Sequence, residues 1–274
     1  MKSSTPPSPE ALRCTLSLDA SEGSFGSPVL ARISLENRGA KEIVLDQPFD
    51  DLYGTAVVQL RRPGESSFSF LKLQHTGVKQ LEGYRSTLPA GQQIVSYVLV
   101  VSDSRGLPVF DADGRYELRA SARTSSGEAI SAPVTVTVGT PARERRERIQ
   151  KAAGDLVHLS LNEALDAATM ARLRQAVGGQ PDFHKALLAA EAVTLINRPD
   201  KSSLDRGAVV LQELRQAGSP LWRELATAWL ALDRARAGDS DAARRLIDEV
   251  PVRSKILDDA RQSLPRDTKR RSPS

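Results

Sequence analysis

Residues 133–157, PVTVTVGTPARERRERIQKAAGDLV, contain an abrupt change of pattern. Pro133–Val138 is the last of several segments typical of strands. Pro141 suits a first helical turn, because its missing N–H would have had no partner there. After it the apolar residues fall three or four apart, as on one helix face: Ile149, Ala152, Ala153, Leu156 and Val157. The change predicts a β-domain that ends at Gly139 and a helical domain that begins at Pro141.

The chain before this change alternates between apolar and polar residues. The first alternation places Leu12, Cys14, Leu16 and Leu18 on one face, which favours a half-buried strand. Further strands are expected at Val29–Leu35, Glu42–Leu45, Thr55–Arg61, Phe68–Leu73, Gln93–Val101 and Arg115–Ala122, with turn signals between them. Short strands with regular turns predict a two-sheet sandwich over residues 11–139. The run Ile94–Val101 is apolar on both sides, which is typical of an inner strand.

After this change, the sequence consists of segments with helical spacing that are separated by residues typical of helix ends. The expected helices run to about Val157, then over Leu161–Val177, Phe183–Ile196, Leu204–Leu214, Leu221–Leu232, Ala243–Val250 and Val252–Ser263. They predict an all-α domain over residues 141–264. The Ser/Pro-rich residues 1–10 and the basic end, residues 265–274, are predicted to be disordered tails.

Length and composition agree with two folded domains. The 274 residues suffice for two cores, so residues 11–139 and 141–264 are expected to fold separately. A net charge of +4 with 4% aromatic residues gives little support for nucleic-acid binding, and none is expected. No apolar run is long enough for a membrane span. The start of the chain carries no hydrophobic leader, which predicts a cytoplasmic protein. An exported protein written without its leader is the alternative.

The sequence contains no recognisable catalytic motif, metal-ligand spacing or cofactor motif. Cys14 is the only cysteine and shares its face with leucines, which predicts a small buried residue rather than a nucleophile. The remaining candidates are isolated histidines and adjacent carboxylates that point apart: His75, His158, His184, Asp50-Asp51 and Asp258-Asp259. We therefore expect no enzyme, no cofactor and no metal, although distant residues could still assemble an active site.

Gly114-Arg115-Tyr116-Glu117-Leu118 resembles the tyrosine corner of immunoglobulin-like sandwiches, in which a tyrosine hydroxyl bonds backbone upstream. Together with Leu35–Gly39 and Leu88–Gly91, it is similar to bacterial immunoglobulin-like domains, including the intracellular proteinase inhibitor domain. The resemblance implies an antiparallel immunoglobulin-like β-sandwich. Leu118 stands where that family has its inter-sheet cysteine, so packing alone would hold the sheets.

In the helical half, Trp222–Ala226 followed by Ala237–Ala243 resembles a helical hairpin of the tetratricopeptide family, although the spacing is longer than that repeat. The resemblance implies helices that bind peptide segments of partner proteins. The two tryptophans, Trp222 and Trp229, share a face with Leu225 and are expected in the core.

A second stripe on the same predicted helix contains Arg223, Thr227, Leu230 and Arg234. If the helices stack as tetratricopeptide-like pairs, Arg223, Thr227 and Arg234 would line a groove for an acidic peptide. A solvated helix face is the alternative. The sequence thus favours a non-enzymatic protein-interaction or scaffold protein. The alternative is a peptidase inhibitor that acts through the sandwich loops, and the second alternative is an unrecognised hydrolase.

Overall fold

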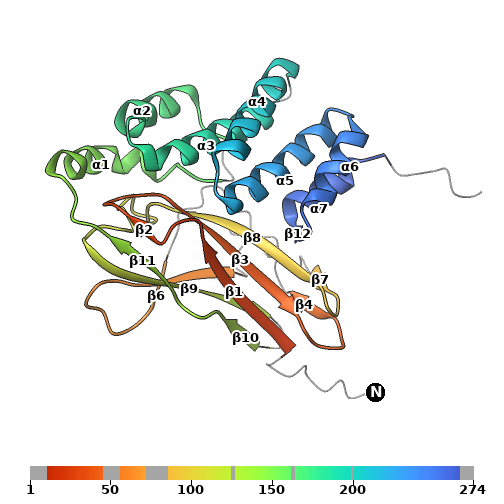
Figure 1. Cartoon of the computed structure of the whole chain (residues 1–274), viewed down its shortest axis with the longest axis horizontal. Coiled ribbons are helices and arrows are strands. Elements are labelled where there is room, and N and C mark those ends of the chain that lie inside the picture. The colour runs from red at the N-terminus through yellow and green to blue at the C-terminus, as the bar shows by residue number, and fades with distance from the viewer. Residues whose placement is uncertain are drawn as a thin grey trace, which may run out of the picture.

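The computed structural model describes residues 11–45, 56–71, 86–124, 127–161, 164–198 and 200–265. The strands of the first half form a β-sandwich, and the helices of the second half lie in a layer over one of its sheets (Figure 1). The predicted fold class, an immunoglobulin-like sandwich followed by an α-helical domain, is confirmed. The predicted tails lie outside the described residues except for Pro265.

The sandwich consists of two main sheets. The first sheet has the order β1 (Leu12–Leu18), β3 (Val29–Asn37), β8 (Gln93–Val100) and β12 (Arg253–Ser254). The second has the order β2 (Glu22–Gly23), β11 (Val134–Val138), β9 (Gly114–Thr124), β5 (Ala56–Arg61) and β6 (Ser69–Phe70), and β10 (Gly127–Ile130) also pairs with β9. A small sheet joins β4 (Ile43–Leu45) to β7 (Ser86–Leu88). The pairs are antiparallel except β2–β11 and β8–β12.

The helical layer begins soon after β11. Its helices are α1 (Arg143–Leu156), α2 (Ala167–Val177), α3 (His184–Ile196), α4 (Lys201–Ala217), α5 (Pro220–Arg236), α6 (Ser240–Glu249) and α7 (Lys255–Ser263), with a short 3-10 turn at Pro181–Phe183. Side-chain oxygens of Asp166, Asp200, Asp239 and Ser254 accept backbone N–H groups at the starts of α2, α4, α6 and α7. Because of these caps, several helices begin at residues other than the apolar ones from which the sequence predicted their starts. The tetratricopeptide-like assignment of the helices stays a prediction.

The predicted helix Val252–Ser263 is partly wrong. Arg253 and Ser254 pair in parallel with Ile94 and Val95 of β8, and the helix begins only after them. Ser254 ends the strand and caps α7, since its hydroxyl accepts the Leu257 N–H at 3.3 Å. A strand of two residues is too short to show an alternating pattern of its own. Arg253 and Ser254 form a strand only through their pairing with β8, which is distant in the sequence.

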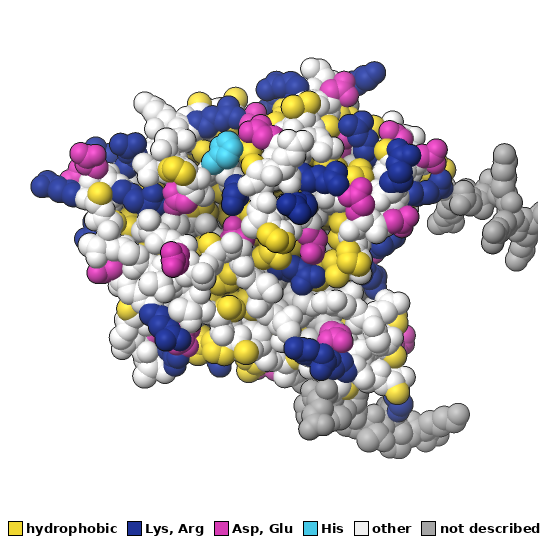
Figure 2. Space-filling view, viewed as in Figure 1, with side chains coloured by type: hydrophobic (Ala, Val, Ile, Leu, Met, Phe, Trp, Pro, Cys, Tyr) yellow, Lys and Arg dark blue, Asp and Glu magenta, His cyan; other side chains and the backbone are white. Residues whose placement is uncertain are grey.

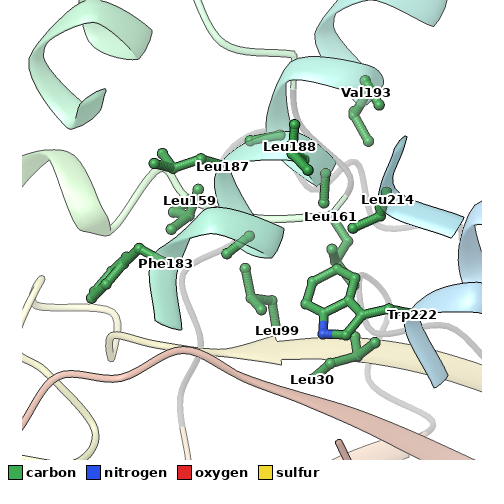
Figure 3. Packing of buried hydrophobic residues seen from close by; sticks show 14 of the residues in the cluster. Leu30, Leu99, Leu159, Leu161, Phe183, Leu187, Leu188, Val193, Leu214 and Trp222 are labelled. Atoms are coloured by element: carbon green, nitrogen blue, oxygen red, sulfur yellow. The ribbon is translucent and has the colours of Figure 1, made fainter. Parts of the chain in front are cut away.

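Strand β8 is apolar on both sides because both of its faces are covered. Ile94 and Val98 belong to the core between the sheets, whereas Val95 and Leu99 belong to a second core with the helices. Figure 3 shows this second core, in which Leu30 and Leu99 of the sheet face Phe183 and Trp222 of the helical layer. The two halves therefore share one hydrophobic core, and we no longer expect them to fold independently.

Polar contacts at the edge of the shared core fix the register of helices on sheet. The indole N–H of Trp222 donates to Asp19 Oδ2 at 2.6 Å, and Asp19 Oδ1 accepts the Leu30 N–H at 2.7 Å. Glu224 forms an ion pair with Arg32 at 2.9 Å and accepts the Tyr97 hydroxyl. These directional bonds select one placement of α5 from the many that apolar packing alone would allow.

The predicted tyrosine corner is present. Tyr116 is fully buried, and its hydroxyl accepts the Ala112 N–H at 2.8 Å and lies 3.0 Å from Asp111 Oδ1, to which it can donate. Its ring packs edge-on against Phe110 with centroids 5.2 Å apart. The corner ties the β9 start to the preceding turn, as the resemblance implies.

Replacing Tyr116 with phenylalanine is expected to cost about 0.5–1.5 kcal/mol, because the Ala112 N–H loses its acceptor. Burial raises the pKa of Tyr116 to about 12. Since this folded-state pKa lies above the unfolded one, the stability that depends on the neutral hydroxyl is present below about pH 10 and declines as the pH rises toward 12. Urea unfolding from pH 8 to 11.5 should therefore show a steeper decline in the wild type than in Tyr116→Phe. Parallel curves would contradict the assignment.

Candidate protein-binding site

A cleft of about 450 Å³ opens at one flank of the sandwich, between the edge of the second sheet and the connection from β8 to β9. We call it the β6 cleft. The residues that line it are Leu60, Arg62, Ser69, Phe70, Leu71, Asp103, Ser104 and Arg105. Its volume falls within the range of about 300–1,000 Å³ that is usual for ligand sites.

One wall of the β6 cleft is the hairpin formed by β5 and β6. Gly64 has a φ of +80°, and this conformation, which favours glycine, lets the chain turn between the two strands. Leu60 is fully buried beneath the cleft, and Phe70 on the edge strand is 56% exposed. An aromatic ring this exposed at a sheet edge leaves much apolar surface in contact with water.

The opposite wall is a tight loop organised by Asp103. The Asp103 carboxylate accepts the N–H groups of Arg105 and Leu107 at 2.9 and 3.1 Å and the Arg105 guanidinium at 2.7 Å. Burial alone would raise the pKa of Asp103, but the bonds from Arg105 and Leu107 outweigh burial and hold it below its usual value. The carboxylate is therefore ionised at neutral pH and holds the loop in one shape.

Helix α1 supports this loop from behind. The Ser102 hydroxyl donates to the Leu156 carbonyl at 3.2 Å. Gly106, with a φ of +79°, lies so close to α1 that a Cβ would be 3.0 Å from the Ala153 carbonyl oxygen. The position of the helical layer on the sandwich thus sets the position of one wall of the cleft.

The β6 cleft suits binding better than catalysis. Leu60, Phe70 and Leu71 offer apolar surface, and Ser69 and Ser104 offer hydroxyl groups. The acid among the lining residues, Asp103, already accepts several hydrogen bonds and so is poorly placed to take a proton. The lining can therefore hold an apolar group and fix polar atoms at its rim.

The predicted partner-binding residues on α5 are only partly accessible. Arg223 is exposed and Arg234 is half-buried, with its Nε 4.0 Å from Asp233 Oδ2. Thr227 and Leu230 are buried, and the Thr227 hydroxyl donates to the Arg223 carbonyl at 2.8 Å. Every residue from Leu225 to Asp233 is buried because α5 packs against helices on several sides. The four residues therefore form no continuous open groove, and a binding role for the two arginines stays a prediction.

The other candidates from the sequence are dispersed. Cys14 is buried as predicted, and burial raises the pKa of its thiol to about 12, which disfavours the nucleophilic thiolate. His184 lies 3.6 Å from Glu213 on the surface. Asp258 and Asp259 form ion pairs at α7 with Arg253, Arg261 and Lys255. His75 and Asp50-Asp51 lie outside the described residues.

Asp233 is a buried acid that the sequence analysis missed. It is 2% exposed, and its Oδ1 has no hydrogen-bond partner within the described part of the chain. Burial raises its pKa, and the nearby charges are Arg234, Asp205 and Arg236. An aspartate directly after the largely apolar run Leu225–Leu232 was the available signal.

Replacing Asp233 with asparagine is expected to raise the free energy of unfolding at pH 7, because the amide keeps the shape of the carboxyl group but carries no negative charge to bury. Because its folded-state pKa is raised, Asp233 is least harmful at low pH, and its penalty grows as the pH rises through that pKa. The gain measured by urea unfolding should therefore be larger at pH 7 than at pH 4.5. The exposed Asp241→Asn is the control. Equal gains at both pH values would show that Asp233 carries no such penalty.

Within the described residues, no group of three or more His, Cys, Asp or Glu side chains lies close enough to hold a metal ion. None of the helices described is long and apolar enough to cross a membrane. On the face seen in Figure 2, acidic and basic side chains are interspersed over the helical half, which gives that face no large patch of one sign.

Comparisons with known proteins identify no family. No protein-family model matches the sequence, and a search of curated proteins finds no match. Among solved structures, the chain is similar to the sporulation control protein Spo0M of Bacillus subtilis, with 12% identity and a TM-score of 0.32, over 53% of this chain and 56% of that one. It is also similar to the CARDB domain of the PF1109 protein of Pyrococcus furiosus, with 10% identity and a TM-score of 0.26, over 47% and 87%.

A third similar structure is a β-glucosidase of Erythrobacter marinus, with 12% identity and a TM-score of 0.27, over 47% of this chain and 15% of the glucosidase. The chain thus spans about half of Spo0M and a small part of the glucosidase. At these identities and TM-scores, none of the three transfers an activity to this chain.

Proposed function

We propose that this protein is a non-enzymatic protein-interaction component that binds its partner at the β6 cleft. The observation that carries the proposal is the exposed Phe70 beside an open cleft whose opposite wall is fixed by Asp103. Interfaces are centred on such aromatic anchors next to well-formed hollows. A rigid wall reduces the entropy lost on binding.

The internal contacts of the molecule also support this choice of surface. The outer face of the first sheet is covered by the helices through Leu30, Leu99 and Trp222. Much of α5, which the sequence favoured as the docking helix, is buried. The flank at β6 offers both a hollow and an exposed large aromatic side chain.

The test compares partners recovered by affinity purification of the tagged full-length chain from its native cells. Ser104→Trp would fill the cleft from its exposed rim, and Phe70→Ala would remove the anchor ring. Val209→Ala, at a 68% exposed valine on α4, is the matched control for loss of exposed apolar surface. We expect partners that are retained by the wild type and the control and lost from both cleft variants, with unchanged melting. Equal recovery from all four proteins would overturn the proposal.

A further inference from the structure

The hydrogen-bond register of the β5–β6 hairpin leaves one residue of β6 pointing to the open edge. Phe70 lies opposite Gln59 and Ser69 lies opposite Leu60, while the Leu71 N–H donates to the Val58 carbonyl at 2.9 Å. Bonded and non-bonded pairs alternate in an antiparallel ladder. Ser69 and Leu71 therefore direct their main-chain groups toward β5, and Phe70 directs its N–H and carbonyl the other way.

Among the described residues, no strand covers the edge at Phe70. In the sheets formed by the described residues, β6 pairs with β5 and with no second strand. Native edges are usually protected by charges, prolines or bulges, whereas β6 presents an aromatic side chain that is 56% exposed. A donor, an acceptor and an apolar ring are thus offered together at one residue.

We propose that the partner binds as an extended, predominantly apolar segment that pairs with the main chain of Phe70 and extends the second sheet. The inference rests on the proposed function and names the partner's chemistry. Side chains of an added strand alternate between the two faces of the sheet. One side chain packs on the Phe70 ring, and its neighbour enters the β6 cleft over Leu60 and Leu71. This is recognition by strand addition, in which main-chain bonds give affinity and the hollow gives specificity.

The charges around the cleft favour an uncharged side chain at the inserted position. The Arg105 guanidinium is held by Asp103 at 2.7 Å, and Arg62 lies 3.7 Å from Asp111 Oδ1. Each cation therefore already has a carboxylate nearby, and little charge remains to select an acidic or a basic segment. The acidic peptide that the sequence predicts as a ligand of Arg223 and Arg234 would bind at α5, which is a different surface.

The experiment selects linear peptides from a random phage-displayed library on the full-length protein and measures binding of the most enriched peptide. Phe70→Ala removes the ring and keeps the N–H, whereas Phe70→Pro removes both. Proline is tolerated on edge strands when its nitrogen faces away from the partner strand, as the Phe70 nitrogen does. We expect about tenfold weaker binding for Phe70→Ala. Phe70→Pro should weaken it about fivefold further through the lost main-chain bond.

A second measurement covers the case in which Phe70→Pro does not fold. Single N-methylation along the peptide should weaken binding at one residue, the one whose N–H pairs with the Phe70 carbonyl, because the N–H groups of its two neighbours face away from β6. A peptide that Ser104→Trp and Phe70→Ala weaken, that Phe70→Pro weakens no further than Phe70→Ala does, and that N-methylation leaves unchanged would overturn strand addition and leave the β6 cleft as a binding site. Failure to enrich peptides, or binding unaffected by every variant, would also overturn strand addition. The proposed function is judged separately on the cell's own partners.

Discussion

Replacing Trp222 with alanine is expected to lower the free energy of unfolding by about 3–5 kcal/mol, the usual cost of deleting a buried tryptophan side chain. Trp222 is 2% exposed and lies where α5 meets the first sheet, against Leu30 and Leu99 (Figure 3). The substitution therefore removes packing that joins the two halves. Chemical denaturation of the full chain measures the change, and a loss below about 1 kcal/mol would contradict this role.

The contribution of the Trp222 hydrogen bond to stability can be measured separately from the contribution of its apolar packing. Trp222→Phe keeps most of the apolar area but leaves Asp19 Oδ2 without the indole N–H. Burial raises the pKa of Asp19, and this N–H opposes the rise by stabilising the ionised carboxylate. The loss in Trp222→Phe should therefore be larger at pH 7 than at pH 4, where a protonated Asp19 depends less on the bond. Trp229→Phe, also buried, is the control and should lose similar stability at both pH values.

Residues 11–139 expressed without the helices are expected to self-associate and to unfold at a much lower denaturant concentration than the full chain. Six side chains of the shared core would lose their helical neighbours: Phe25, Leu30, Val95, Tyr97, Leu99 and Val101. Burial of such a side chain contributes about 1.5–3 kcal/mol, so the sum is comparable with the whole stability of a typical domain. Light scattering and urea unfolding measure both effects.

The double substitution Leu99→Thr and Val101→Thr provides an internal control, because it should benefit the isolated sandwich and harm the full-length chain. In the isolated sandwich it should reduce self-association, because it makes the uncovered face more polar. In the full chain the same pair should destabilise, because both side chains are buried against the helices. A monomeric isolated sandwich with near full-chain stability would show that the halves fold independently, as their lengths first suggested.

The sequence predicted the classes of structure well where periodicity is local. The alternation in Leu12–Leu18 and the helical spacing after Pro141 each depend on nearby residues, and both appear in the structure. The tyrosine corner could also be predicted from the sequence, because its turn and its tyrosine are adjacent in the chain.

What the sequence did not predict depends on residues far apart. The two apolar faces of Ile94–Val101 suggested an inner strand but could not show that helices cover one face. The burial of Thr227 follows from neighbouring helices that its own stripe does not specify. The β6 cleft joins residues 60–71 with residues 103–105, and no spacing within either segment points to the other. Phe70 likewise lies within the predicted strand Phe68–Leu73, where no local pattern indicates that its ring is exposed.

Site-specific photo-crosslinking tests the central claim most directly. A photoreactive phenylalanine analogue would be incorporated at position 70 of the full-length chain in its native cells, and in a second protein at position 209 as the exposed control. Binding at the β6 cleft predicts a discrete crosslinked product from position 70 that Ser104→Trp abolishes, and no such product from position 209. A product from position 209 with none from position 70 would contradict the account.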